Sequence, residues 1–319
     1  MSSPILEIND LKVYHGTRTV PVRAVDGVSF TLKEGEILGL AGESGCGKST
    51  LATGLLKLIT PPTYIAGGEA LFHGKDLISM SEEELKNIRW RHIALLPQAS
   101  MNALNPVMRI HDQIKDAMVA HKVEESEGKV QKHIETLLRS VALAPRVAKD
   151  YACELSGGMK QRSIVAMALA VKPELIIADE PTSALDVVVQ RGVLELLVDS
   201  KEKLGSSVLL ISHDIAIISE IADRLAIIYA GKIMEIQDIF EIFNEPLHPY
   251  TQGLIASVPS LERKGIPKSI PGLPPDLRNP PPGCRFSPRC PYAKDDCRNR
   301  EPELKETEPG KFVACHLYS

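Results

Sequence analysis

Apolar residues alternate with polar ones in two early stretches of the chain. Val28, Phe30 and Leu32 recur at every second residue, and so do Ala70 and Phe72. A period of two places these side chains on one face of a strand. The two stretches therefore predict an antiparallel β region around a glycine-rich turn.

Three other stretches are short apolar runs with one polar residue at an end: 36–41, 175–179 and 208–212. Such runs are typical of parallel strands that are buried on both faces of a sheet. Between Gln113 and Leu143 the period becomes helical, and one face carries Val130, Ile134, Leu137, Leu138 and Val141. With no internal repeat, the pattern predicts an α/β fold with a parallel-sheet core, an antiparallel β subdomain and a helical insertion.

Proline divides the chain into two parts. Of the 23 prolines, 12 lie from Pro259 onward, although that part holds fewer than a quarter of the residues. Proline fixes φ and lacks an N–H donor, so this tail cannot consist mainly of helix or of sheet interior. We therefore expect one domain over residues 1–256 and a small, irregular, Pro- and Cys-rich C-terminal module over 257–319.

The composition narrows the class of protein. The 319 residues are 44% apolar and 24% charged, which is ordinary for a globular protein. A net charge of −4 gives no basic field, so nucleic acid is not expected as a partner. No apolar run reaches the roughly 18 residues of a membrane-spanning helix, and the N-terminus has no secretory signal pattern. We expect a cytoplasmic protein that works at a membrane only by docking on another protein.

The segment Gly42-Glu-Ser-Gly-Cys-Gly-Lys48-Ser49 fits the phosphate-loop pattern G-x-x-x-x-G-K-S/T. It follows a predicted strand and precedes a helical run from Thr50 to Leu58, as a loop of this kind requires. Backbone amides and the helix N-terminus would bind phosphate oxygens, Lys48 would reach the β- and γ-phosphates, and Ser49 would ligate Mg²⁺. The predicted nucleotide contacts here are Gly42, Glu43, Ser44, Gly45, Cys46, Gly47, Lys48, Ser49 and Thr50.

Two further motifs carry groups that suit a nucleotide. The predicted strand 175–179 ends in Asp179, which could hold Mg²⁺, and Glu180, which could polarise an attacking water. The segment Ser156-Gly157-Gly158 at the start of a predicted helix is a second anion cradle.

With Ser183-Ala-Leu-Asp186 and Ser212-His213, these motifs resemble the ATP-binding-cassette (ABC) ATPases over roughly Ile5 to Leu254. The resemblance implies the ABC nucleotide-binding domain, with a helical subdomain at about 99–165. It also implies that ATP lies between the phosphate loop of one subunit and the Ser156 segment of another, so the chain must form a dimer.

The same resemblance assigns a role to each of four more residues. Tyr14 would stack on adenine, and Gln98 would sense Mg²⁺ and the attacking water. His213 would contact the γ-phosphate, and Asp186 would communicate across the dimer. The expected catalytic residues are Glu180, His213, Gln98 and Lys48, and the expected Mg²⁺ ligands are Ser49, Gln98 and Asp179.

Two segments resemble one branch of the family, the dipeptide and oligopeptide importers of the dipeptide-permease type. They are the stretch from Gln98 to Arg109 and the stretch from His248-Pro-Tyr-Thr251 through the tail. This implies an ATPase subunit at the cytoplasmic face of the membrane, paired with a paralogue or a copy of itself. Its further partners would be transmembrane permease subunits and, indirectly, a substrate-binding protein. The alternatives are an importer of another solute such as nickel, a soluble ATPase that acts on nucleic acid, and a regulatory subunit that binds ATP without hydrolysing it.

Four of the six cysteines lie in the last 36 residues with the spacing C-x5-C-x6-C-x17-C. Thiolates suit zinc or an iron–sulfur cluster, but these gaps fit neither the usual zinc pattern nor the compact ferredoxin run. Spacing alone therefore leaves open an unnamed metal or packed, reduced thiols. The resemblance to the importer branch implies a 4Fe-4S cluster on Cys284, Cys290, Cys297 and Cys315, with Zn²⁺ as the alternative, in a structural or a redox role.

Overall fold

The computed structural model describes residues 3–98, 103–121, 123, 126–183, 185–258 and 269–318. The chain forms two compact units. The first takes most of its residues from 80–209, and the second takes its residues from 4–32, 37–79 and 210–319. Strand β8 (Ser207–Ser212) lies where the chain leaves the first unit for the second. None of the described helices is both long and apolar enough to cross a membrane.

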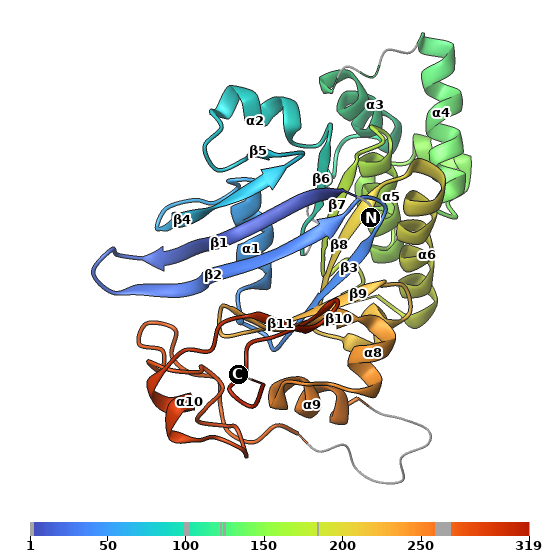
Figure 1. Cartoon of the computed structure of the whole chain (residues 1–319). Helices are drawn as coiled ribbons and strands as arrows, with labels where there is room; N and C mark the ends of the chain where they lie inside the picture. The colour runs from blue at the N-terminus through green and yellow to red at the C-terminus, as the bar shows by residue number, and fades with distance from the viewer. Residues whose placement is uncertain are drawn as a thin grey trace. The chain divides into compact units, whose positions relative to one another are not determined.

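An antiparallel sheet opens the second unit. Its strands lie in the order β2-β1-β4-β5, and Figure 1 shows the long strands β2, β1 and β4 side by side. The strands are β1 (Pro4–Gly16), β2 (Pro21–Lys33), β4 (Thr63–Phe72) and β5 (Lys75–Asp76). The alternating residues Val28, Leu32 and Ala70 are all buried. The antiparallel β region predicted from the period of two is therefore confirmed.

A second group of strands in this unit leads to the phosphate loop. All five residues of β3 (Ile37–Ala41) are buried, and β3 pairs in parallel with β9 (Arg224–Tyr229). The antiparallel strand β10 (Lys232–Asp238) follows β9. Directly after β3 the chain forms the phosphate loop and enters α1 (Lys48–Leu55). The other helices of this part are α7 (Ile215–Ser219), α8 (Ile239–Asn244) and α9 (Pro249–Ala256).

The first unit combines two buried parallel strands with helices. Strand β6 (Ile93–Leu96) pairs with β7 (Leu175–Asp179), whose short apolar run predicted a buried strand. The helices are α2 (Glu82–Ile88), α3 (Ile110–Ala120), α4 (Glu127–Ser140), α5 (Gly157–Leu169) and α6 (Val187–Leu204). Two short 3-10 segments, Pro145–Lys149 and Ala152–Glu154, precede α5. The predicted helical insertion consists of α3 and α4, and the five apolar residues expected on one face of α4 and just after it are buried.

The C-terminal module is largely irregular over residues 269–318, as its prolines predict. It contains one short helix, α10 (Asp295–Asn299), and two strands, β11 (Lys305–Glu308) and β12 (Lys311–Val313). The strands were not predicted: β12 pairs with β10, and β11 pairs with β12, so the module extends a sheet of the second unit. Phe286 packs edge-on against the ring of Tyr229 on β9, with ring centroids 5.3 Å apart. The module thus shares its core with the preceding domain. The boundary at 256/257 and the helical subdomain at about 99–165 stay predictions.

Candidate nucleotide-binding site

The phosphate loop depends on glycine at two points of close backbone approach. Gly47 caps α1 with φ +108, and a Cβ there would lie 2.0 Å from the carbonyl oxygen of Ala24. A Cβ on Gly42 would lie 2.1 Å from the carbonyl oxygen of Ile228. Only glycine fits both positions, because any side chain would push the loop away from β2 or β9.

Lys48 lies inside this loop and is only 6% exposed. Its Nζ donates to the carbonyl oxygens of Gly42 at 2.7 Å and Glu43 at 3.1 Å. Ser49 and Thr50 follow in the first turn of α1 and are half-buried. Burial raises the pKa of the Cys46 thiol, so this side chain is a neutral packing group of the loop. The loop therefore presents the backbone amides, ammonium and hydroxyl that a bound phosphate chain requires.

Tyr14 lies on β1 in the same unit and is half-buried. Its hydroxyl donates to Oδ1 of Asp26 at 2.5 Å. Burial and the hydrogen bond to Asp26 raise the pKa of Tyr14 to about 12, so the phenol stays neutral. The ring predicted to stack on adenine is thus held at its hydroxyl end.

Three of the predicted catalytic and Mg²⁺-binding residues belong to the first unit. Asp179 is buried at the end of β7, and Glu180 follows it with φ +49, in the left-handed region that non-glycine residues seldom adopt. Nε2 of Gln98 donates to Oε2 of Glu180 at 3.1 Å, although the two residues are 82 positions apart. The structure therefore brings together two residues that were predicted to handle the attacking water.

The signature segment and Asp186 both begin helices of the first unit. The hydroxyl of Ser156 caps α5 by accepting the amide of Met159 at 3.3 Å, and Gly157 and Gly158 form the first turn. Asp186 caps α6 in the same way, since its Oδ1 accepts the amide of Val189 at 3.0 Å. Local capping explains both positions structurally, while the exposed helix start at Ser156 remains suited to an anion.

The family of the chain follows from its similarity to known proteins. Residues 25–183 match the ABC transporter family, and residues 234–297 match the C-terminal region of the oligopeptide/dipeptide transporter family. The dipeptide transport ATP-binding protein DppD of Caldanaerobacter subterraneus subsp. tengcongensis is 43% identical, over 99% of this chain and 98% of its own. The chain belongs to the ABC transporter family.

Other relatives and solved cassettes agree with this assignment. The oligopeptide transport ATP-binding protein OppD of Bacillus subtilis is 43% identical over 98% of this chain and 88% of its own. DppD of Escherichia coli is 38% identical over 98% and 96%. The dimeric structure of MJ0796, a bacterial ABC transporter cassette, aligns with a TM-score of 0.66 and 25% identity over 73% of this chain and 98% of that chain. A dimeric post-hydrolysis state of the same cassette, bound to ADP and Pi, aligns equally well.

The predicted residues of this ABC ATPase are shared between its two units. The first unit holds Gln98, Asp179 and Glu180, together with the Ser156 segment and Asp186. The second holds Tyr14, the phosphate loop and His213, which is exposed directly after β8. The catalytic and binding roles given to these residues stay predictions.

The four cysteines of the module gather around one small cavity of about 10 Å³. Burial, followed by the proximity of the other three thiols, raises the pKa of the Cys284 thiol to about 11. Within the described residues, no three His, Cys, Asp or Glu side chains are placed to hold a metal ion. Cys284, Cys290, Cys297 and Cys315 therefore line the same cavity without forming a single-ion site, and their role as cluster ligands stays a prediction.

The sequence did not predict two residues that contact the nucleotide site or a neighbour of it. Arg289 binds the carboxylate of Glu43 in the phosphate loop, and Arg285 binds Asp26, the partner of Tyr14. Both lie in the segment Cys284-Arg-Phe-Ser-Pro-Arg-Cys290. One signal could have found them: two arginines beside an aromatic residue, between two cysteines predicted to ligate a metal, indicate a buried segment, and buried cations need acidic partners elsewhere in the chain.

Proposed function

We propose that the chain is the ATP-binding and ATP-hydrolysing subunit of a membrane importer of dipeptides or oligopeptides. One observation carries the proposal: a complete phosphate loop and the Gln98–Glu180 pair occur in a chain that matches dipeptide transport ATP-binding proteins over nearly its full length. The second family match, over 234–297, extends the similarity into the C-terminal region of peptide transporters.

The proposed mechanism assigns a task to each group. The loop from Gly42 to Ser49 holds the β- and γ-phosphates, with Lys48 as the cation inside it. Tyr14 stacks on the base. Glu180, oriented by Gln98, accepts a proton from the attacking water, and His213 binds the γ-phosphate.

The groups proposed to bind Mg²⁺ have suitable chemistry. Ser49, Gln98 and Asp179 offer a hydroxyl, an amide and a carboxylate oxygen, which are the hard donors that this ion prefers. Asp179 is buried at the end of β7. Bound Mg²⁺ would supply positive charge against the β- and γ-phosphate oxygens.

A second ATPase subunit completes the proposed site, because Ser156, Gly157 and Gly158 face ATP across a dimer in this family. The partner is a paralogue or a second copy, and Asp186 lies at the same junction. The dimer docks on transmembrane permease subunits at the cytoplasmic face of the membrane, and a substrate-binding protein delivers peptide to the permease. The dimeric cassette structures support the pairing.

Replacement of Glu180 by glutamine tests the catalytic assignment. We expect the Glu180→Gln variant to keep ATP binding, to lose roughly 10²-fold or more in turnover, and to accumulate as an ATP-bound dimer in size-exclusion chromatography. Glu195→Gln is the matched control, because Glu195 lies on α6 with a side chain 70% exposed and pairs only with Arg191 among the described residues. Unchanged turnover in Glu180→Gln would remove Glu180 from its role.

Uptake measurements test the cargo. The chain, its partner ATPase and the permease subunits would be expressed in a host that lacks peptide import, and uptake of a labelled dipeptide and of nickel would be compared. We expect uptake of the dipeptide that depends on Glu180. Nickel uptake without peptide uptake would contradict the proposed cargo, while ATP turnover would still support the ATPase.

We further propose that the four module cysteines hold a 4Fe-4S cluster. All four thiols line one cavity, and they are soft donors that suit iron–sulfur chemistry. Because each iron of a cluster takes one thiolate, these thiols need not converge on one atom, as a zinc ion would require. The cluster would link four positions of the irregular module, from Cys284 to Cys315.

Metal analysis of the chain, purified without oxygen, tests this site. We expect about four irons and four acid-labile sulfides per chain, lost in Cys290→Ser and kept in the control Cys153→Ser, whose thiol is exposed in the other unit. One zinc without sulfide, or no metal at all, would overturn the cluster assignment.

A further inference from the structure

Two arginines of the C-terminal module are buried beside the nucleotide site. Arg285 is 3% exposed and Arg289 is 9% exposed. A buried guanidinium is tolerated only when its charge is paired and its N–H groups are hydrogen-bonded. Each arginine has its carboxylate partner outside the module, on a residue that contacts or belongs to the predicted ATP site.

Arg289 forms a two-pronged ion pair with the phosphate loop. Its Nη1 and Nη2 donate to the two carboxylate oxygens of Glu43 at 2.8 and 2.9 Å. Its remaining donors reach the hydroxyl of Tyr229 at 3.2 Å and the carbonyl oxygens of Pro271 and Ile270. A planar guanidinium held in this way fixes both the place and the orientation of the carboxylate.

The charge of Glu43 matters because Glu43 is the second residue of a loop that binds a polyanion. An unpaired carboxylate there would repel the phosphates of ATP, and Arg289 cancels that charge. A second contact holds the backbone of the same residue, since the amide of Glu43 donates to the hydroxyl of Tyr250, which is buried on α9 just before the module, at 3.0 Å.

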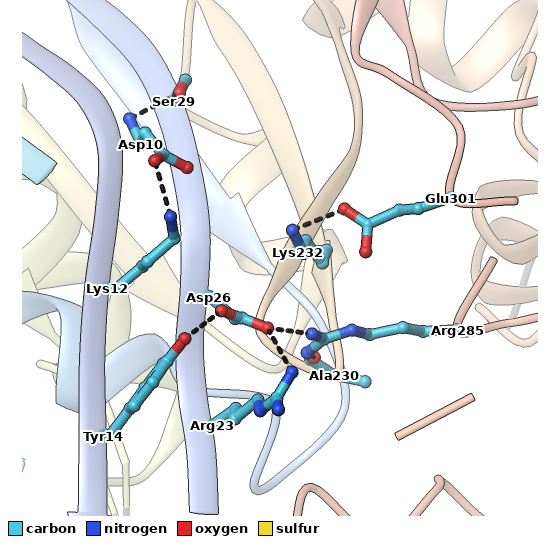
Figure 2. Close-up of polar contacts among 10 residues, drawn as sticks. All are labelled: Asp10, Lys12, Tyr14, Arg23, Asp26, Ser29, Ala230, Lys232, Arg285 and Glu301. Carbon is cyan, nitrogen blue, oxygen red and sulfur yellow. Dashed lines mark hydrogen bonds and ion pairs between the residues drawn. The ribbon is translucent and has the colours of Figure 1, made fainter. Parts of the chain in front are cut away.

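Arg285 acts on the other end of the nucleotide site. Figure 2 shows its guanidinium between the carboxylate of Asp26 and the carbonyl oxygen of Ala230. The other oxygen of Asp26 accepts the hydroxyl of Tyr14, so the three side chains form one continuous chain of contacts. The turn at Ala230 also reaches the phosphate loop, because the amide of Gly231 donates to the carbonyl oxygen of Cys46 at 2.9 Å.

Asp26 is charged in this arrangement. Burial would raise the pKa of its carboxyl, but the hydrogen bond from Tyr14 and the charge of Arg285 outweigh burial and leave that pKa below its ordinary value. Arg23 and Lys232 are the other cations near this carboxylate, and Lys232 is itself paired with Glu301. Arg285 is therefore the buried counter-ion that keeps Asp26 in place for Tyr14.

We infer that Arg285 and Arg289 are positioning residues for ATP, through which the C-terminal module sets the conformation of the nucleotide site. Arg289 orients the phosphate loop and neutralises Glu43. Arg285 orients Tyr14 through Asp26. The inference rests on the proposed ATP site and adds to it a dependence of nucleotide affinity on two arginines that are not among the predicted ATP contacts.

The first test removes the charge of Arg289 and then the charge of its partner Glu43. Calorimetry on the purified full chain would measure ATP affinity in Arg289→Met, and we expect binding about tenfold weaker than in the wild type. A second change, Glu43→Gln, should restore most of that affinity, because the unpaired carboxylate is then gone. The control is Arg278→Met, which removes a comparable pair with Asp276 on an exposed part of the module and should leave affinity unchanged.

The second test distinguishes an effect on binding of the base from an effect on binding of the phosphates. Arg285→Met should weaken ATP binding about tenfold and the binding of inorganic triphosphate less, because the contact through Asp26 and Tyr14 acts on the base, and only the contact through Ala230 acts on the phosphate loop. Tyr14→Phe removes the hydroxyl that Asp26 holds, so adding Arg285→Met to Tyr14→Phe should have little further effect. Arg285→Lys, which keeps the charge beside Asp26, is the variant to use if the methionine variant does not fold.

The outcomes distinguish the inference from the proposed function. A wild-type chain that does not bind ATP refutes the proposed function. A wild-type chain that binds ATP no better than Arg289→Met and Arg285→Met refutes the inference alone. A second result also overturns the inference. In it, the arginine variants lose ATP affinity in proportion to their loss of thermal stability, Glu43→Gln restores no affinity to Arg289→Met, and the effects of Arg285→Met and Tyr14→Phe add.

Discussion

His248 begins helix α9 and is only 1% exposed. Its Nδ1 accepts the amide of Tyr250 at 3.0 Å, so that nitrogen carries no proton. Its own amide donates to Oε2 of Glu235, on the neighbouring strand β10, at 2.8 Å. Burial lowers the pKa of the His248 ring to about 3, and the ring is therefore neutral in the folded protein.

The size of the resulting pH effect follows from the two states of this ring. In the unfolded chain the pKa of a histidine is about 6.5. Below that pH the unfolded chain binds a proton that the folded protein does not bind, so the free energy of unfolding falls as the pH falls, down to a pH of about 3. At about 1.36 kcal/mol per pH unit, lowering the pH from 7 to 5 removes about 2 kcal/mol.

Urea denaturation of the wild type and of His248→Asn, followed by circular dichroism at pH 7, 6 and 5, measures this contribution. Asparagine does not titrate, and its side-chain oxygen can accept the Tyr250 amide as a helix cap. We expect the wild type to lose about 2 kcal/mol more than the variant between pH 7 and pH 5. Parallel losses in the two proteins would refute the assignment of a buried, neutral ring, whatever their absolute stabilities.

Three further predictions concern backbone approach, capping and the core. Gly47→Ala should abolish ATP binding in calorimetry, because the new Cβ would lie 2.0 Å from the Ala24 carbonyl oxygen. Gly45→Ala should weaken ATP binding less, because its new Cβ would have no other atom within 4 Å. Ser81→Ala removes the capping box of α2 and should lower the free energy of unfolding by about 1 kcal/mol. Leu38→Ala in the buried strand β3 should lower it by about 2–5 kcal/mol in urea denaturation, and a loss below 1 kcal/mol would contradict the burial of β3.

The parts of the site that sequence could predict are those whose chemistry lies in consecutive residues. The phosphate loop needs a strand, spaced glycines, a lysine and a helix start, and all of these lie between Ile37 and Leu55. The alternating strand β2 and the short apolar run of strand β7 could be predicted for the same reason, since burial on one face or on both is visible in a short window.

The contacts that sequence could not predict join distant residues. Arg285 and Asp26 are 259 positions apart, and Arg289 and Glu43 are 246 positions apart. No local period marks such a pair, and an aspartate within a strand looks like a surface residue until its partner is known. The strands β11 and β12 were missed because exposed residues such as Lys305 carry no buried pattern, and their pairing depends on the edge of β10.

The C-terminal module and the phosphate loop therefore depend on each other. Over residues 269–318 the module is irregular outside one short helix and two strands, and its aromatic core is shared with Tyr229 and Tyr250. The ion pair between Arg289 and Glu43 anchors the module and at the same time orients the loop. Coupling between two sites is reciprocal, so a contact through which the module strengthens ATP binding must also let bound ATP stabilise the module. An apolar residue in the place of Arg289 could not orient the Glu43 carboxylate, so it would remove this coupling between the module and the loop.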